Sequence, residues 1–185
     1  MTLTKTPICD FGKKADPFEL KSTNNKMISL NDVKGENGTL IMFICNHCPY
    51  VKAVVTEIVS DCKELEKEGV KSVAIMSNDI VNYPDDSFEK MIEFSKNNGF
   101  NFPYLIDETQ EIAKKFGAVC TPDFFGYNKN QELQYRGRIR ELKDLKPIKG
   151  GKSDLLKAME MIAKTGEGPK QQVSSMGCNI KWFNN

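Results

Sequence analysis

The sequence predicts a single α/β domain of 185 residues, with a central mixed sheet flanked by helices. An almost continuous apolar run at 39–44 is typical of a strand buried on both faces. Directly after it, apolar residues recur at helical spacing, and a second buried strand follows at 70–76. Strands that alternate with helices pair in parallel. The length suits one domain of about 150–200 residues.

The elements of the N-terminal half follow from local pattern. Short strands at Phe18–Leu20 and Met27–Leu30 flank a polar turn and predict a β-hairpin ahead of the main fold. Thr39–Ile44 is the first central strand. From Pro49 the apolar period changes to that of an amphipathic helix, which ends near Gly69. Val70–Met76 is the next buried strand.

The C-terminal half continues this alternation and then loses it. Acidic residues and a serine at 85–87 predict the start of a helix, and Asn128-Lys-Asn130 is a hairpin signal. The predicted elements are a helix at 85–98, a strand at 103–106, a helix at 109–116, strands at 123–127 and 133–137, and a helix at 154–164. Residues 166–185 are expected to form an irregular tail of the same domain, 1–185.

Composition excludes several classes of protein. The chain has 26 Lys and Arg against 25 Asp and Glu, a net charge of +1, so we expect no nucleic-acid partner. The first twenty residues hold no apolar stretch typical of a secretory signal. The longest apolar run, 40–45, is too short to cross a bilayer, so we expect no membrane partner and a cytoplasmic location.

The chemistry is expected at Cys45-Asn46-His47-Cys48, where the first central strand meets its helix. Unsatisfied N–H groups at a helix N-terminus stabilise a thiolate, and a nearby imidazole adds to this. A second cysteine three positions on can close a disulfide with the first. The alternative is a metal site. One C-x-x-C supplies only two of the four ligands that structural zinc needs, and the other four cysteines are isolated. We therefore expect a redox dithiol with no metal ion and no cofactor.

The sequence, including this motif, resembles a known group of proteins. It is similar to thioredoxin-fold redoxins of the alkyl hydroperoxide reductase/thiol-specific antioxidant (peroxiredoxin-like) group, in the subfamily with a Cys-Asn-His-Cys-Pro-Tyr motif. The likeness runs over about residues 10–183. It rests on the segments 43–52, 77–79, 103–110, 117–125, 135–139 and 177–182. The resemblance implies a thioredoxin fold with an N-terminal β-hairpin extension. It also implies a cis peptide bond at Thr121-Pro122, with the Thr121 backbone lining a substrate groove and available to pair with a bound substrate.

The resemblance leaves two mechanisms open. In a thioredoxin-type mechanism Cys45, the more exposed thiol, attacks a disulfide and Cys48 resolves the mixed disulfide. In a peroxiredoxin-type mechanism Cys48, which precedes Pro49, holds the place of the peroxidatic cysteine. Cys45 then stands where that pattern has a threonine, and Ile41 where it has a proline, which weakens the case for peroxidase activity.

We therefore favour a thiol–disulfide oxidoreductase in which Cys45 attacks and His47 tunes the couple. Its partners would be a protein or small-molecule disulfide and an unidentified thiol reductant. The alternatives are an antioxidant thiol peroxidase that reduces hydroperoxides, and a non-catalytic module that binds a peptide or a metal. Cys120, beside the Thr-Pro turn, and Cys178, in the tail, are candidate auxiliary thiols with packing as the competing explanation. Cys62 fits a buried small hydrophobe on its helix.

Overall fold

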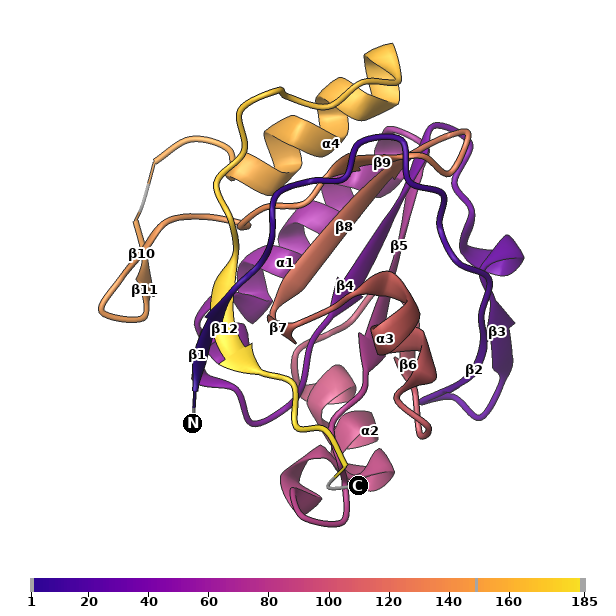
Figure 1. Cartoon of the computed structure of the whole chain (residues 1–185), viewed down its shortest axis with the longest axis vertical. Helices are drawn as coiled ribbons and strands as arrows, with labels where there is room; N and C mark the ends of the chain where they lie inside the picture. Colours follow the sequence, from indigo (N-terminus) through magenta and orange to yellow (C-terminus); the bar gives the residue numbers. More distant parts are fainter. Residues whose placement is uncertain (1, 149, 184–185) are drawn as a thin grey trace.

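The computed structural model describes residues 2–148 and 150–183. Its main sheet has seven strands in the order β3-β2-β6-β5-β4-β8-β9 (Figure 1). These strands are β2 (Glu19–Ser22), β3 (Met27–Ser29), β4 (Gly38–Phe43), β5 (Val70–Met76), β6 (Tyr104–Ile106), β8 (Asp123–Asn128) and β9 (Leu133–Tyr135). Strands β4, β5 and β6 are parallel, whereas β2, β3, β8 and β9 join through antiparallel pairings. The expected mixed sheet is confirmed.

The helices cover both faces of this sheet (Figure 1). They are α1 (Pro49–Lys67), α2 (Phe88–Asn97), α3 (Glu111–Phe116) and α4 (Asp154–Thr165), with short 3₁₀ turns η1 (Asn31–Val33) and η2 (Pro84–Asp86). Successive side chains of a strand point to opposite faces. Leu40 and Met42 of β4 accordingly pack with α1 and α4, while Ile41 and Phe43 pack with α3 around Phe116. This double burial explains why the 39–44 run lacks polar alternation.

The C-terminal tail differs from its prediction. Residues 166–183 are not irregular throughout, because they contain strand β12 (Met176–Asn179). It is the middle strand of a second sheet, β1-β12-β7, with β1 at Leu3–Lys5 and β7 at Cys120–Thr121 (Figure 1). A small hairpin of β10 (Leu142–Lys143) and β11 (Lys146–Pro147) was not predicted either. The two ends of the described chain thus meet beside the Thr121-Pro122 turn.

The predicted helix at 85–98 is shorter than expected. The α-helix starts at Phe88, and Ser87 is its N-cap, whose hydroxyl accepts a hydrogen bond from the Lys90 N–H. Pro84–Asp86 form a separate 3₁₀ turn, which leaves Asp86 free to point into the protein. Asp86, one of the acidic residues that predicted the helix start, is therefore a buried residue outside α2.

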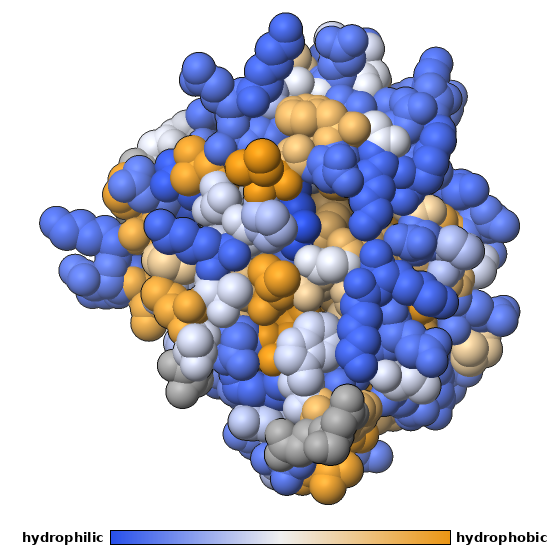
Figure 2. Space-filling model, viewed as in Figure 1, coloured by the Kyte–Doolittle hydropathy of each residue, from blue (hydrophilic) through white to orange (hydrophobic). Residues whose placement is uncertain are grey.

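Hydrophilic side chains predominate on the face of the molecule in Figure 2, with apolar ones interspersed. In the part of the chain that the structure describes, no helix is both long and apolar enough to cross a membrane.

A buried ion pair holds the turn that follows β7. Asp123 is fully buried, and its carboxylate accepts hydrogen bonds from Arg136 Nη2 at 2.9 Å and Nε at 3.3 Å. The guanidinium also donates to the Gly117 carbonyl at 2.7 Å and lies 4.4 Å from the centre of the Phe125 ring. Burial raises the pKa of Asp123, and Arg136 opposes that rise. Since Asp123 follows Pro122 directly, the pair fixes the Thr121-Pro122 turn to the main sheet.

Replacing Arg136 by leucine should therefore destabilise the fold strongly, by about 3–5 kcal/mol, because Asp123 would stay buried without its partner. Arg138 provides the matched control. It pairs with Asp154 at 2.8 Å, but the two side chains are 27% and 42% exposed, so Arg138→Leu should cost about 1 kcal/mol or less. Urea unfolding at constant pH measures both. Equal losses of unfolding free energy would contradict this role for Arg136.

Candidate active site

The C-x-x-C segment joins the buried central strand to the first long helix. Cys45 lies just after β4, and Cys48 is the N-cap of α1, with extended backbone angles and a carbonyl that accepts the first helical hydrogen bond, from Lys52. Pro49 takes the first helical position, where no N–H is needed. Both cysteines are 0% exposed. The prediction that Cys45 is the more exposed thiol is therefore wrong.

The two sulfurs face the Thr121-Pro122 turn. The Thr121-Pro122 peptide bond is cis, as the resemblance implied. Cys48 Sγ lies 3.1 Å from the Thr121 carbonyl oxygen, and Cys45 Sγ lies 3.4 Å from the Thr121 hydroxyl. A third thiol completes the group, because Cys178 Sγ lies 2.8 Å from Cys48 Sγ. Of the two candidate auxiliary thiols, the structure brings Cys178 into contact with the dithiol.

Cys48 is the sulfur best able to carry a negative charge. Its pKa is lowered to about 5, chiefly because it accepts a hydrogen bond from the Cys45 thiol, with further donation from Cys178, Thr121 and the Val51 N–H in the first turn of α1. Burial opposes this effect without cancelling it. The same hydrogen bond, together with burial and the charge of Asp86, raises the pKa of Cys45 well above its ordinary value. The two shifts have opposite directions, so they favour a thiolate at Cys48 and a protonated thiol at Cys45.

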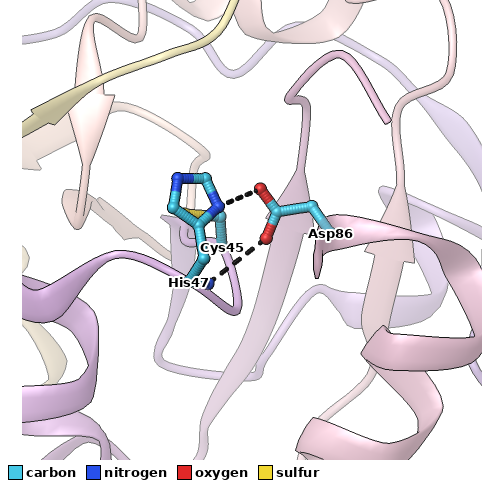
Figure 3. Close-up of side chains that lie close together, drawn as sticks. All are labelled: Cys45, His47 and Asp86. Carbon is cyan, nitrogen blue, oxygen red and sulfur yellow. Dashed lines mark hydrogen bonds and ion pairs between the residues drawn. The ribbon is translucent and has the colours of Figure 1, made fainter. Parts of the chain in front are cut away.

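A buried carboxylate that the sequence analysis did not single out orders the C-x-x-C turn. Asp86, fully buried, accepts hydrogen bonds from the backbone N–H groups of Asn46 and His47 at 2.8 and 3.3 Å. Its second oxygen lies 2.6 Å from His47 Nδ1, and Figure 3 shows the ring turned toward the carboxylate with Cys45 behind it. The Asn78 side-chain amide donates to the same oxygen at 2.8 Å. Four donors therefore satisfy a charge that would otherwise be costly to bury.

His47 is held in one orientation by this carboxylate. Its ring stacks on Tyr83, with 5.8 Å between ring centroids, and its side chain is 16% exposed. The hydrogen bond with Asp86 raises the pKa of His47 above its ordinary value, against the effect of burial. The imidazole was expected to tune the thiol pair directly. In the structure the imidazole is instead hydrogen-bonded to Asp86, so its influence on the sulfurs acts together with that carboxylate.

Within the described part of the chain, Cys45, His47 and Asp86 form a group that could hold a metal ion. One ligand atom from each lies within 4.8 Å of the other two (Figure 3). Three ligands of this kind resemble the protein part of an open zinc site. His47 Nδ1 and Asp86 already share a hydrogen bond, however, which a metal would have to replace.

The remaining cysteines and the groove residues have different surroundings. Cys62 is buried on the core face of α1, and burial raises its pKa to about 12, which confirms its packing role. Cys120 is buried as well, with its sulfur 3.7 Å from the Pro122 carbonyl oxygen. The Thr121 backbone was expected to be available to a substrate. It is instead paired with β12, in which Cys178 stands opposite Thr121.

Comparison with known proteins agrees with this geometry. The model of the AhpC/TSA family matches residues 11–141, more than half of the chain. The chain belongs to the AhpC/TSA family. This AhpC/TSA protein is 27% identical over 117 residues to "Thiol-disulfide oxidoreductase ResA" of Bacillus subtilis (strain 168), an alignment that spans 63% of the chain and 61% of that relative.

Solved structures show the fold of this AhpC/TSA protein. An uncharacterized conserved protein from Geobacillus kaustophilus superimposes with a TM-score of 0.94 and 38% identity, over 100% of the chain and 98% of its own. The thioredoxin domain of a thiol-disulfide oxidoreductase from Bacteroides vulgatus, 13% identical, superimposes with a TM-score of 0.58 over 68% of the chain and 86% of its own. The predicted thioredoxin fold is confirmed.

The thiolate should be visible in a titration. Because the pKa of Cys48 is lowered to about 5, ultraviolet thiolate absorbance should rise with a midpoint near pH 5, and Cys48→Ser should remove that step. By linkage, this group contributes stability in full above the ordinary thiol pKa of about 9, and the contribution is lost as the pH falls through 5. Cys62→Ser is the matched control and should leave the step unchanged. A step that survives in Cys48→Ser would assign the thiolate elsewhere.

The His47–Asp86 pair gives a second, independent titration. His47 is the only histidine, so its ring protons give one set of NMR signals. Its pKa should lie above the ordinary value of about 6.5 and should fall in Asp86→Asn, which keeps the shape of the side chain but removes its charge. The exposed Asp85 is the neighbouring control, and Asp85→Asn should leave the His47 pKa close to that of the wild type. The same pKa in Asp86→Asn and wild type would refute the pairing.

Proposed function

We propose that this protein is a dithiol–disulfide oxidoreductase in which Cys48 is the attacking thiolate and Cys45 the resolving thiol. The observation that carries the proposal is that the pKa values of the two cysteines are shifted in opposite directions. One sulfur, at the N-terminus of α1, has its pKa lowered to about 5, and the other has its pKa raised, keeps its proton and donates a hydrogen bond to the first. A thiolate with a thiol beside it is the arrangement that thiol–disulfide exchange requires.

The order of attack differs from our preference on sequence alone, which was Cys45 first. Exposure no longer favours Cys45, because both sulfurs are equally buried. Cys48 has the lower pKa, and it lies directly before α1, where the Val51 N–H faces its sulfur. It also holds the place of the peroxidatic cysteine in the resemblance. The lowered pKa and the resemblance thus both favour Cys48.

The exchange proceeds in two steps that balance. The Cys48 thiolate attacks one sulfur of an external disulfide, an S–S bond forms to Cys48, and the other substrate sulfur leaves as a thiolate. Cys45 then releases its proton to that leaving group and attacks Cys48, which expels the second substrate sulfur as a thiolate. The substrate gains two electrons, and the protein keeps a Cys45–Cys48 disulfide. An external thiol reductant returns the two electrons.

Asp86 acts in this scheme as a positioning residue. It anchors the turn through the N–H groups of Asn46 and His47, which fixes the distance between the two cysteines. Its negative charge also contributes to the raised pKa of Cys45, so it helps to keep the proton on the resolving thiol. The similarity to ResA, a thiol-disulfide oxidoreductase, supports the reaction type. A thiol peroxidase of antioxidant function remains the competing proposal, and the experiment below separates the two.

Trapping identifies the attacking cysteine. In a Cys178→Ser background, which removes the third neighbouring thiol, Cys45→Ser should accumulate mixed disulfides through Cys48 because nothing resolves them. Cys48→Ser in the same background should accumulate none and should lower disulfide reduction to the uncatalysed rate. Non-reducing electrophoresis and peptide mass spectrometry measure the adducts, and Cys62→Ser is the control with full activity.

Two outcomes would contradict this assignment. Adducts through Cys45 in the Cys48→Ser variant, with none through Cys48 in Cys45→Ser, would reverse the order of attack. Rapid hydroperoxide consumption that depends on Cys48, without turnover of a disulfide substrate, would make the protein a thiol peroxidase.

A further inference from the structure

Strand β12 occupies the sheet edge beside the dithiol. It runs antiparallel to β7, with Cys178 opposite Thr121 and Asn179 opposite Cys120. The two backbones are in close contact at Gly177, where a Cβ would stand 2.0 Å from the Thr121 carbonyl oxygen. The strand therefore lies where the resemblance places a substrate, and it presents a sulfur to the site.

Cys178 belongs to the thiol cluster by distance and by burial. Its sulfur lies 2.8 Å from Cys48 Sγ, its residue is 1% exposed, and none of the three cysteines of the cluster is in a disulfide. The Tyr50 N–H, in the first turn of α1, also faces the Cys178 sulfur. Burial and the neighbouring Cys48 raise the pKa of Cys178 to about 12, so in the reduced protein it is a protonated donor to the thiolate.

Hydrogen bonds beyond β12 hold the tail in this place. The Lys181 N–H donates to the Asn78 side-chain oxygen at 2.8 Å, and the Lys181 carbonyl accepts from the Asp79 N–H at 2.8 Å. The buried Gln110 side chain donates to the same carbonyl and accepts from the Phe183 N–H, both at 2.8 Å. These hydrogen bonds anchor the tail to the loop after β5 and to Gln110. The tail therefore holds Cys178 against Cys48 through several contacts besides the one between the two sulfurs.

We propose that Cys178 is a third redox-active cysteine, which exchanges with the Cys45–Cys48 disulfide to form a Cys48–Cys178 disulfide. The inference rests on the proposed dithiol chemistry of Cys48. In the exchange Cys178 loses its proton and attacks Cys48 Sγ, while Cys45 leaves as a thiolate and takes up that proton. One S–S bond forms and one breaks, so the step needs no further oxidant or reductant.

The exchange moves the disulfide from Cys45–Cys48 to Cys48–Cys178, which changes the segments that it joins. Before it, the disulfide lies within the C-x-x-C turn and the tail is held only by hydrogen bonds and packing. After it, β12 is bonded covalently to the first residue before α1, and Cys45 is again a thiol beside the Thr121 hydroxyl. The product couples the oxidation state of the dithiol to the docked position of the tail.

Oxidation of a Cys45→Ser variant tests the pairing directly. Diamide accepts two electrons and two protons from a nearby pair of thiols. Of the six cysteines, Cys45→Ser leaves five, and formation of Cys48–Cys178 should reduce the alkylatable thiols in denaturant from five to three. Peptide mass spectrometry without reductant should identify the linked peptides. Cys45→Ser with Cys178→Ser should keep its four remaining thiols under the same conditions, because Cys62 and Cys120 are not part of the cluster.

Two further measurements separate this inference from the proposed function. Wild-type protein treated with one equivalent of diamide and quenched in acid should contain both Cys45–Cys48 and Cys48–Cys178. In Gly177→Ala, whose methyl group displaces β12, the share of Cys48–Cys178 should fall at least about tenfold while Cys45–Cys48 persists; Met176→Ala, at an exposed neighbouring position, is the control.

A Cys45–Cys48 disulfide in the wild type together with five free thiols in oxidised Cys45→Ser would overturn the role of Cys178 and leave the proposed function standing. Failure of the wild type to form Cys45–Cys48 would instead refute the proposed dithiol function.

Discussion

The antiparallel pairing of β12 with β7 is the interaction on which the site depends. It joins the last strand of the chain to the segment before the cis proline and sets Cys178 opposite Thr121. That register gathers three sulfurs, two from the C-x-x-C turn and one from β12, at the N-terminus of one helix. It also excludes water, since each of the three cysteines is at most 1% exposed. The electrostatics of the dithiol follow from this enclosure, because hydrogen bonds to a charge are stronger where water does not compete.

A buried thiolate needs groups that stabilise its charge. Among the described residues, those groups are hydrogen-bond donors, and no cationic side chain is one of them. Cys48 accepts from two thiols, the Thr121 side chain and a helix N–H, while the imidazole is held by Asp86 a few ångströms away. The negative charge of the Asp86 carboxylate raises the pKa of Cys45 and so helps to keep that thiol protonated. Two neighbouring groups of the same kind are thereby pushed to opposite protonation states, which assigns them different roles in exchange.

Local pattern was enough to predict the central sheet, the helices around it and the C-x-x-C at their junction. The apolar run ending at Ile44 and the helical period after Pro49 depend on neighbours in sequence, and periodicity reports such neighbours well. Asp86 was taken for a helix start because its partners, Asn46 and His47, are 39 or 40 residues away. Strand β12 has no apolar alternation, and its pairing depends on the absence of a side chain at Gly177.

The enclosure has a thermodynamic consequence for substrate access. A disulfide substrate cannot reach Cys48 while β12 is docked, because the strand fills the edge and Cys178 fills the approach to the sulfur. Linkage is reciprocal: if one state of the dithiol stabilises docking of the tail, docking of the tail stabilises that state of the dithiol by the same free energy. A Cys48–Cys178 bond strengthens docking, whereas a substrate bound to Cys48 opposes it. In the proposed scheme, docking of the tail and oxidation of the dithiol are therefore two coupled equilibria, linked through Cys45, Cys48 and Cys178.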